Sequence, residues 1–291
     1  MVLSVLLTLT LGASPVPDTD VVAPTQAWEA KRLQRLQAED GWLSLVGLEW
    51  LKEGANIAGS APGSAVKFPA PAPAQVGTFT RKEQAVSFQP APGTAVTLAG
   101  KPFAGGALKT DADPDGPDVL QLGRLRFQSI VRGDRMGIRM KDPEAPARKA
   151  FQGIPTYAPS ERWRIVARWE PSNPPVQIAV PNVLGGVDQS PAPGTAIFTV
   201  DGKEYRLTPV LEGDSPELFF IFGDQTNRTE TYGAGRFLYA QPPKDGKVTL
   251  DFNRAYNPPC AFSPFATCPL PPKQNRLAIR VEAGEKRVPS H

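Results

Sequence analysis

Proline is the residue that most constrains how this chain can fold. It occurs 33 times in 291 residues. Proline fixes one backbone torsion angle and has no N–H to donate, so it interrupts helix interiors and central strands. The sequence therefore predicts a mainly β protein in which many short strands are joined by stiff, proline-rich loops.

Length and composition narrow the class of protein further. A chain of 291 residues suggests one large domain or two medium ones. Hydrophobic residues make up 41% and charged residues 21%, which is typical of a chain that builds a packed core. The 32 basic and 29 acidic residues leave a net charge of only +3. This balance gives no reason to expect a nucleic-acid partner.

Histidine usage excludes several kinds of active site. The single histidine of this sequence is the last residue, His291. A Ser-His-Asp triad, a Cys-His pair and an HExxH zinc site are therefore not expected. A carboxylate with a raised pKa can replace histidine as a base, so catalysis itself is not excluded. No cofactor is predicted.

The N-terminal segment resembles a signal for export. Residues 1–13 are apolar, too short to span a membrane, and followed by the proline-rich stretch SPVPDTD. This pattern is typical of a secretory signal peptide, so we expect residues 1–20 to be a signal peptide and linker and the protein to be periplasmic or extracellular. No Lys or Arg precedes the apolar run, which leaves a cytoplasmic protein with a buried N-terminal strand as the alternative. No other segment is long and apolar enough to predict a membrane span.

Hydrophobic periodicity predicts one helix followed by two sets of strands. The helix spans residues 25–39, with Thr25 as its N-cap and Trp28, Leu33 and Leu36 as its apolar stripe. The first set of strands is expected at 43–51, 65–68, 77–80, 85–88, 95–98, 119–122, 124–131 and 137–140. The second set is expected at 162–169, 176–180, 196–200, 203–207, 218–222, 236–239, 247–253 and 276–282.

Two Asp-Gly turns and one break in the strand pattern suggest how these strands are organised. The turns Val200-Asp-Gly-Lys203 and Lys244-Asp-Gly-Lys247 are typical of tight hairpins. We expect the second turn to pair residues 236–239 with residues 247–253. The pattern breaks near residues 142–160, so the predicted organisation is a helix at 21–40, a β-sandwich at 41–145 and a β-rich sandwich or barrel at 146–291.

Four segments carry distinctive combinations of polar and aromatic residues. They are DGWLSLVGLEWL at 40–51, RGDRMGIR at 132–139, GDQTNRTETYGAGRF at 223–237 and DFNRAYNPPCAFSPFATCPLPP at 251–272. Together they resemble the bacterial and archaeal domain-of-unknown-function 1684 family, over about residues 28–286. The resemblance implies family membership and no particular reaction. Arg228 departs from the pattern, because the resemblance implies a glycine there.

The first half carries a second resemblance. The segments GANIAGS at 54–60, VKFP at 66–69, VGT at 76–78, LAGKP at 98–102 and LGRLRF at 122–127 are similar in order to a forkhead-associated β-sandwich. Such domains bind phosphothreonine through an arginine after the first glycine and through a Ser-x-x-His loop. Here Ser60 follows Gly59, and no serine and histidine stand at the second loop. We therefore expect a sandwich that supports its neighbour and does not bind phosphothreonine.

Polar residues follow the apolar strand at 218–222 and the strand at 247–253, where loops often carry sites. The candidate ligand-binding residues are Asp224, Thr226, Asn227, Tyr232, Arg236, Asp251, Asn253, Arg254 and Tyr256. Six of them are expected to converge on one concave surface of the second domain, because arginine forks suit a carboxylate or phosphate: Asp224, Tyr232, Arg236, Asp251, Arg254 and Tyr256. In the alternative, Arg236 and Arg254 pair with Asp224 and Asp251 as buried structural ion pairs and bind nothing.

Cys260 and Cys268 are the only cysteines, with seven residues between them and flanked by prolines. A disulfide is expected in an exported protein. Two buried free thiols, a nucleophile and a thiolate metal ligand are the alternatives. A structural zinc site needs four ligands, and no EF-hand spacing supports calcium, so no metal is predicted.

A third group is predicted to form a salt-bridge network, either solvated or between domains, with a basic cleft wall as the alternative. It consists of Arg132, Asp134, Arg135, Arg139 and Asp142. The tryptophans at 42, 50, 163 and 169 are interpreted as core residues.

Three functions remain compatible with the sequence. The preferred one is an exported two-domain β-protein that holds a small polar or anionic ligand in its C-terminal domain. The second is a hydrolase or transferase that uses Asp, Tyr, Arg and Cys260 without histidine. The third is a purely structural or interaction protein, and the sequence predicts no oligomeric state.

Overall fold

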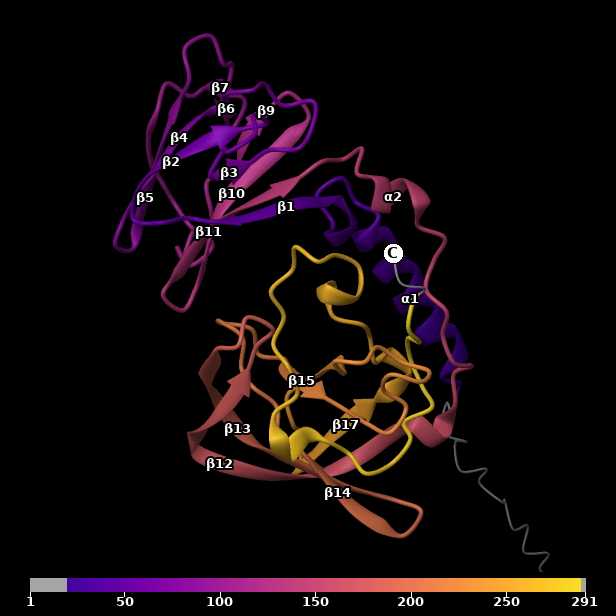
Figure 1. Ribbon diagram of the computed structural model, residues 1–291. Coiled ribbons are helices and arrows are strands. Elements are labelled where there is room, and N and C mark those ends of the chain that lie inside the picture. Colours follow the sequence, from indigo (N-terminus) through magenta and orange to yellow (C-terminus); the bar gives the residue numbers. More distant parts are fainter. Residues whose placement is uncertain (1–19, 289–291) are drawn as a thin grey trace, which may run out of the picture.

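The structure is a computed structural model, and it describes residues 20–288 (Figure 1). The apolar segment at residues 1–13, which the sequence suggests is a signal peptide, lies outside the described residues, as does His291. Export therefore stays a prediction. Within residues 20–288, no helix is long and apolar enough to cross a membrane.

The N-terminal helix forms, but with a different start and a different buried face from those expected. α1 spans Val22–Leu36, and its N-cap is Val21, which makes no side-chain capping bond. Thr25 is not the cap and lies buried in the first turn. The buried residues are Thr25, Arg32 and Leu36, so Leu36 is the buried member of the predicted apolar stripe, whereas Trp28 and Leu33 are half-buried. The reason is tertiary: Arg32 forms a buried ion pair with Glu285, which is distant in sequence.

The N-terminal half is a β-sandwich built from two sheets. One sheet has the order β1-β11-β10-β9-β6-β7, and the other has the order β3-β2-β4-β5-β8. The strands are β1 (Leu45–Trp50), β2 (Gly54–Gly59), β3 (Val66–Lys67), β4 (Gly77–Lys82), β5 (Ala85–Pro90), β6 (Thr97–Leu98), β7 (Lys101–Pro102), β8 (Gly106–Leu108), β9 (Leu120–Leu122), β10 (Leu125–Arg132) and β11 (Arg135–Lys141). Side chains of both sheets fill the core, with Phe68, Phe79, Phe88 and Phe127 at its centre.

Every strand expected between residues 43 and 140 overlaps an observed strand. The sequence does not predict three further strands, β2, β7 and β8. β2 was missed because its sequence, GANIAG, holds a single β-branched residue and two glycines, which weaken a strand prediction. Its last residue, Gly59, has a structural reason to be glycine. A Cβ there would lie 2.0 Å from the carbonyl oxygen of Ala74, which is too close for any side chain.

Residues 142–160 contain no strand and lead the chain from one half to the other. A short helix, α2 (Pro146–Ala150), lies in this stretch, and a 3-10 helix at Glu161–Trp163 precedes the next strand. Beyond it, a four-stranded sheet has the order β14-β13-β12-β17, and β15 and β16 form a separate pair. These strands are β12 (Arg164–Pro181), β13 (Val187–Val200), β14 (Lys203–Leu207), β15 (Leu218–Phe222), β16 (Arg236–Ala240) and β17 (Lys247–Asp251).

β12 is one long strand where the sequence predicts two. Pro171, Pro174 and Pro175 interrupt the ladder with β13, and the register shifts between Pro171 and Val176. Because proline cannot donate to a ladder, it is tolerated in a strand at such a bulge. The strand continues past the irregularity, and the mainly β fold class is confirmed.

The two Asp-Gly turns both form, but only the first joins the strands expected. The turn at residues 200–203 connects β13 to β14. At the second turn, Asp245 and Gly246 adopt positive φ and Lys244 and Lys247 bond to each other, as in a tight turn. However, β16 pairs with β15 and β17 pairs with β12, so the predicted pairing of 236–239 with 247–253 is wrong. The turn is a corner between two sheets that share one core.

The β15–β16 pair lies between two apolar regions. Leu218, Phe220 and Phe222 face the core shared with the four-stranded sheet. Phe219 and Ile221 face the other way, toward Leu45 and the segment around Cys268. A strand that is buried on both faces has apolar residues at every position, which explains the sequence LFFIF.

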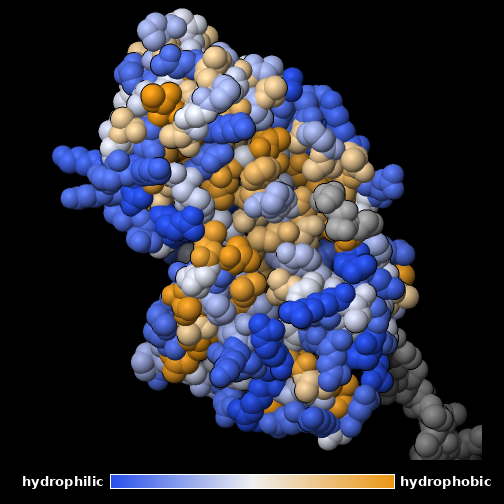
Figure 2. All heavy atoms as spheres, in the orientation of Figure 1, coloured by the Kyte–Doolittle hydropathy of each residue, from blue (hydrophilic) through white to orange (hydrophobic). Residues whose placement is uncertain are grey.

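Apolar side chains from both halves meet at a common junction. Leu36 and Leu43 pack with Phe262 of the C-terminal half, and Leu45 packs with Phe219 and Phe237. Figure 2 shows apolar residues gathered in a band across the middle of this face. Trp163 and Trp169 are buried as predicted, whereas Trp42, at this junction, and Trp50 are only half-buried.

Candidate functional site

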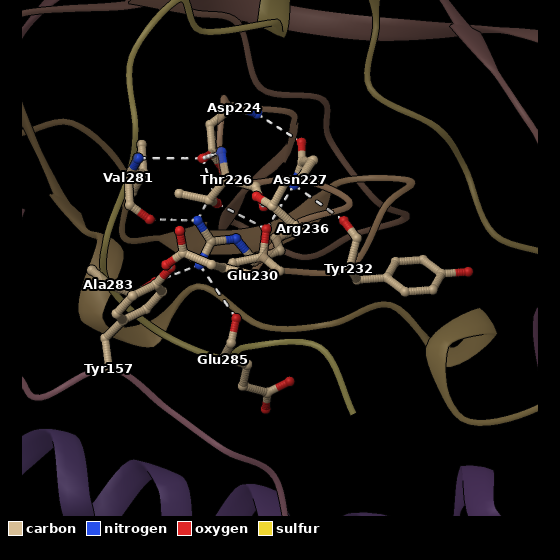
Figure 3. A network of polar contacts seen from close by, with 12 residues as sticks. Tyr157, Asp224, Thr226, Asn227, Glu230, Tyr232, Arg236, Val281, Ala283 and Glu285 are labelled. Atoms are coloured by element: carbon tan, nitrogen blue, oxygen red, sulfur yellow. Dashed lines mark hydrogen bonds and ion pairs between the residues drawn. The ribbon is translucent and has the colours of Figure 1, made fainter. Parts of the chain in front are cut away.

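Arg236 and Asp224 form a fully buried ion pair in the C-terminal half (Figure 3). One terminal nitrogen of Arg236 lies 2.9 Å from the Asp224 carboxylate, and both side chains have 0% exposure. The same guanidinium donates to the carbonyl oxygens of Val281, Ala283 and Glu285. Arg236 therefore clamps the C-terminal segment onto the fold. This segment forms no strand, so the strand predicted at 276–282 is wrong; only an isolated bridge joins Arg276 to Gly223.

The loop after Asp224 is closed by its own hydrogen bonds. Asp224 accepts from the backbone and hydroxyl of Thr226, at 2.8 and 2.6 Å, and Asn227 donates to Thr231 and to the Tyr232 carbonyl. The Tyr232 ring points away from this network (Figure 3). Arg228 has a φ of 74°, a left-handed conformation that glycine adopts without strain. This geometry explains why a glycine suits that position.

A large cleft lies where the C-terminal half meets α1 and the edge of the N-terminal sandwich at Arg132 and Lys141. Its volume is about 1640 Å³, and its walls come from α1, from residues around Trp42, and from β15, β16 and β17. Basic side chains outnumber acidic ones on these walls. The basic residues are Lys31, Arg32, Arg35, Arg132, Lys141, Arg164, Lys244, Lys247 and Arg254, and the acidic residues are Asp40, Glu212, Glu217 and Asp251.

Aromatic rings line one side of this cleft. Phe219 stacks on Tyr239 with ring centroids 4.8 Å apart, and Tyr239 lies nearly parallel to Tyr256 at 6.2 Å. The Arg32 guanidinium lies 4.7 Å from the centre of the Tyr256 ring. Burial raises the pKa of both tyrosines well above its usual value, so their hydroxyls remain protonated at neutral pH. The Tyr239 hydroxyl donates a hydrogen bond to the Glu212 carboxylate.

The structure divides the predicted site residues into two groups. Asp251, Arg254 and Tyr256 line the cleft, with Arg254 Nε 3.3 Å from the Asp251 carboxylate. Asp224, Thr226, Asn227 and Arg236 belong to the buried clamp. Asn253 is buried and anchors the backbone of Ser160, while Tyr232 lies on the loop beside the clamp. The prediction that Asp224 and Arg236 share one concave surface with Asp251, Arg254 and Tyr256 is wrong.

Strand alternation is the physical reason for this division. Successive side chains of a strand point to opposite faces. In β16, Leu238 and Ala240 face the core as Arg236 does, whereas Phe237 and Tyr239 face the other way. The sequence therefore predicts Arg236 at the site from its position after a loop, but does not predict Tyr239, whose side chain is the one that reaches the cleft. The sequence does not predict Arg32 either, which no local pattern marks, because an arginine on a helix normally points to solvent.

Arg32 and Glu285 anchor α1 to the C-terminal segment. The Arg32 Nε lies 3.1 Å from one oxygen of Glu285, and a terminal nitrogen donates to the Asn257 carbonyl at 2.9 Å. The other oxygen of Glu285 accepts from the Asn257 N–H at 2.7 Å. Burial nevertheless raises the pKa of Glu285 above its usual value, although Arg32 and the Asn257 N–H oppose this shift.

We expect the free energy of unfolding of the wild type to depend on pH through Glu285. As the pH rises above about 4.5, the wild type should lose stability relative to the Glu285→Gln variant, which has no titrating group at this position. A carboxyl whose pKa is raised in the folded state favours folding in its protonated form, and this contribution is lost as pH rises through the folded-state pKa. Urea denaturation of both proteins between pH 4 and 8 measures the difference. The exposed control Glu161→Gln should follow the wild type, and a pH-independent difference for Glu285→Gln would contradict the expectation.

Cys260 and Cys268 lie at disulfide-bonding distance, with Cα atoms 6.2 Å apart. They close the loop that packs against the N-terminal half, and the Cys260 N–H donates to the Cys268 sulfur at 3.1 Å. The alternative in which Cys260 is a nucleophile requires this pair to be reduced. Within residues 20–288, no group of His, Cys, Asp and Glu side chains is arranged to hold a metal ion.

We expect Cys260→Ser/Cys268→Ser to lower the free energy of unfolding by about 2–3 kcal/mol, because a bond that closes so short a loop restricts the unfolded chain. Denaturation of wild type and variant, each with and without reductant, measures the change; only the wild type should respond to reductant. Intact mass after alkylation of native, non-reduced protein gives an independent check. Alkylation of both thiols would show that no bond exists.

Comparison with known proteins places the chain in a family without assigning a reaction. No curated protein matches the chain. An uncharacterised protein of Haloarcula marismortui, from gene locus rrnAC0354, is 31% identical over 48% of this chain and 78% of its own, with a TM-score of 0.40. A structure from work on phosphothreonine-dependent FHA domain interactions is 17% identical over 32% of this chain and 92% of its own, with a TM-score of 0.23. The family described as Protein of unknown function (DUF1684) matches residues 149–286, and the chain belongs to this family.

Proposed function

We propose that this protein binds a small anionic ligand with a planar portion in the cleft between α1 and the β15–β16 pair. The observation that carries this proposal is the excess of positive charge on the cleft walls, which are lined by nine basic and four acidic side chains. Several of these cations, including Arg164, Lys244 and Lys247, form no ion pair with any residue in the described part of the chain. Clefts lined by one sign of charge concentrate ligands of the opposite sign.

The aromatic side of the cleft supports the planar portion of the ligand. Ligand pockets commonly combine apolar and aromatic walls with a few placed polar groups. Tyr239 is 39% exposed, and its ring is held between Phe219 and Tyr256, so it offers an ordered surface at little entropic cost. The ligand-binding region thus lies at the edge of the C-terminal half and includes side chains of α1, which extends the prediction of a site within the C-terminal domain alone.

Charge reversal at the cleft tests this function. We expect Lys244→Glu/Lys247→Glu to weaken the binding of phenyl phosphate or benzoate by about tenfold or more, because four units of charge change near the ligand. Isothermal titration calorimetry at low salt measures the two affinities. Lys52→Glu/Lys203→Glu is the matched control, since it also changes the charge by four units, and both lysines are exposed and outside the cleft; it should bind as the wild type does.

Two outcomes would count against the proposal. Equal loss of affinity in the control variant would show that only the net charge matters. Absence of binding of both probes to the wild type, together with native mass spectrometry that shows no retained small molecule in the freshly purified protein, would remove ligand binding as the function of the cleft.

A further inference from the structure

One buried arginine of the N-terminal sandwich faces the C-terminal half and lacks a charged partner. In β11, Met136, Ile138 and Met140 fill the core of the sandwich, so alternation places Arg139 on the opposite face. Arg139 is only 5% exposed there. Its guanidinium lies 5.6 Å from the centre of the Trp42 ring and donates to the hydroxyl of Thr267, in the loop closed by Cys260 and Cys268.

Arg139 and Arg132 converge on the same oxygen atom. Arg132 Nε lies 2.8 Å from Thr267 Oγ1, and an Arg139 terminal nitrogen lies 3.0 Å from it. A hydroxyl oxygen that accepts two hydrogen bonds retains its own proton for donation. The Nε atom of Arg139 is buried and has no hydrogen-bond partner within the described part of the chain. The cluster therefore presents donors that lack an acceptor.

The charges of the cluster do not balance. Asp111 pairs with Arg132, at 2.7 Å, and Arg139 has no carboxylate within ion-pair distance among residues 20–288. Burial, aided by the charge of Arg132, lowers the pKa of Arg139 to about 10, so the guanidinium remains charged at neutral pH. A buried charge without a partner is costly. A negatively charged group beside Arg139 would relieve this cost.

Two members of the cluster, Arg132 and Thr267, face the cleft, and Arg139, which lines neither of the two spaces, lies behind Thr267 and donates to its hydroxyl. Arg132 and Thr267 line both the large cleft and an adjoining cavity of about 220 Å³. Phe219, the first ring of the aromatic stack, also lines both spaces. The two carboxylates of the smaller cavity already accept hydrogen bonds, Glu212 from Tyr239 and Asp188 from Asn182. Neither carboxylate hydrogen-bonds to the cluster, so Arg132 and the Thr267 hydroxyl face the cavity without competition from these two groups.

We propose that Arg132, Arg139 and Thr267 form a subsite for the oxyanion group of the ligand, a carboxylate or a phosphate. The inference rests on the proposed function, because the subsite shares the cleft. The oxyanion accepts from Arg132 and from the Thr267 hydroxyl, which now donates, while the unpaired charge of Arg139 attracts the anion from behind Thr267. Guanidinium groups are suited to both kinds of oxyanion. Because the arginines and Thr267 come from different halves of the chain, bound ligand also ties the two halves together.

Calorimetry with inorganic phosphate and with acetate, each in a chloride buffer free of other oxyanions, tests the subsite in the wild-type protein. We expect at least one of them to bind at millimolar concentration. Arg139→Gln and Thr267→Val should each weaken that binding by about tenfold or more, since the first removes the unpaired charge behind Thr267 and the second removes the hydroxyl that donates to the anion. Arg126→Gln is the control, because Arg126 lies in β10, pairs with Glu39 and is outside both spaces, and it should change the affinity less than about twofold.

Thermal unfolding provides a second measurement that also reports folding. Without oxyanion, Arg139→Gln should unfold at the same temperature as the wild type or higher, because the variant removes an unpaired buried charge. Addition of the bound oxyanion should raise the midpoint of the wild type and leave that of Arg139→Gln unchanged. An equal rise in both proteins would overturn the subsite.

The outcomes separate the subsite from the proposed function. If phosphate alone binds, the subsite takes phosphates, and if acetate alone binds, it takes carboxylates; both results support it. If phenyl phosphate binding depends on Lys244 and Lys247 but not on Arg139, the cleft binds anions and the subsite is wrong. If phosphate or acetate binding depends on Arg139 while the lysine variant leaves phenyl phosphate binding unchanged, the subsite stands and the wider proposal fails. If the wild type binds neither phosphate nor acetate, the subsite is also wrong.

Discussion

Replacement of Arg236 with methionine is expected to lower the free energy of unfolding by about 3–5 kcal/mol. The substitution leaves the Asp224 carboxylate at 0% exposure without its cation, and it leaves three backbone carbonyls of the C-terminal segment without a donor. Methionine retains an unbranched stem of similar size, so the loss reports mainly the missing charge and hydrogen bonds. Urea denaturation at neutral pH measures it.

Arg162→Met is the matched control for this change. Arg162 pairs with Asp201 on the surface, where the two side chains are 55% and 71% exposed, and the loss should be at most about 1 kcal/mol. Asp224→Asn in the Arg236→Met background should restore part of the stability, because it removes the unpaired buried charge. A loss for Arg236→Met as small as that of the control would show that the clamp does not hold the C-terminal segment.

Replacement of Arg32 with methionine is expected to cost about 3 kcal/mol at neutral pH. Glu285, whose side chain is 3% exposed, loses its cation, and α1 loses its anchor to the Asn257 carbonyl. Loss of the cation also favours the protonated form of Glu285. The deficit relative to the wild type should therefore shrink as pH falls toward 4.5, which denaturation at several pH values measures.

Arg35→Met supplies the control on the same helix. Arg35 is exposed one turn further along α1, so its replacement should change stability by less than about 0.5 kcal/mol. A large loss in both variants would indicate that helix propensity, and not the buried pair, is responsible. A deficit of Arg32→Met that stays constant with pH would contradict the assignment of Glu285 as its partner.

Local sequence chemistry accounts for much of the secondary structure. Proline spacing, strand alternation and the two Asp-Gly turns predict a mainly β chain, and the strands at 203–207 and 218–222 have the expected bounds. These features depend on residues that lie close together in sequence, where torsion angles and hydrogen bonds are decided within a few residues. The turn at 244–247 also forms locally, but its residues do not determine which sheets the two flanking strands join.

The sequence by itself determined the strand-rich fold class, the N-terminal helix, the close pair of cysteines and the polar character of the loops after β15 and β17. Only the tertiary structure decided which polar residues are buried supports and which line the cleft. Arg236 and Tyr239 lie three positions apart in one strand, yet one holds a buried clamp and the other faces the cleft. Arg32, Arg139 and Thr267 acquire their surroundings from partners more than 100 residues away. Burial and charge pairing are properties of such long-range contacts, and no local pattern encodes them.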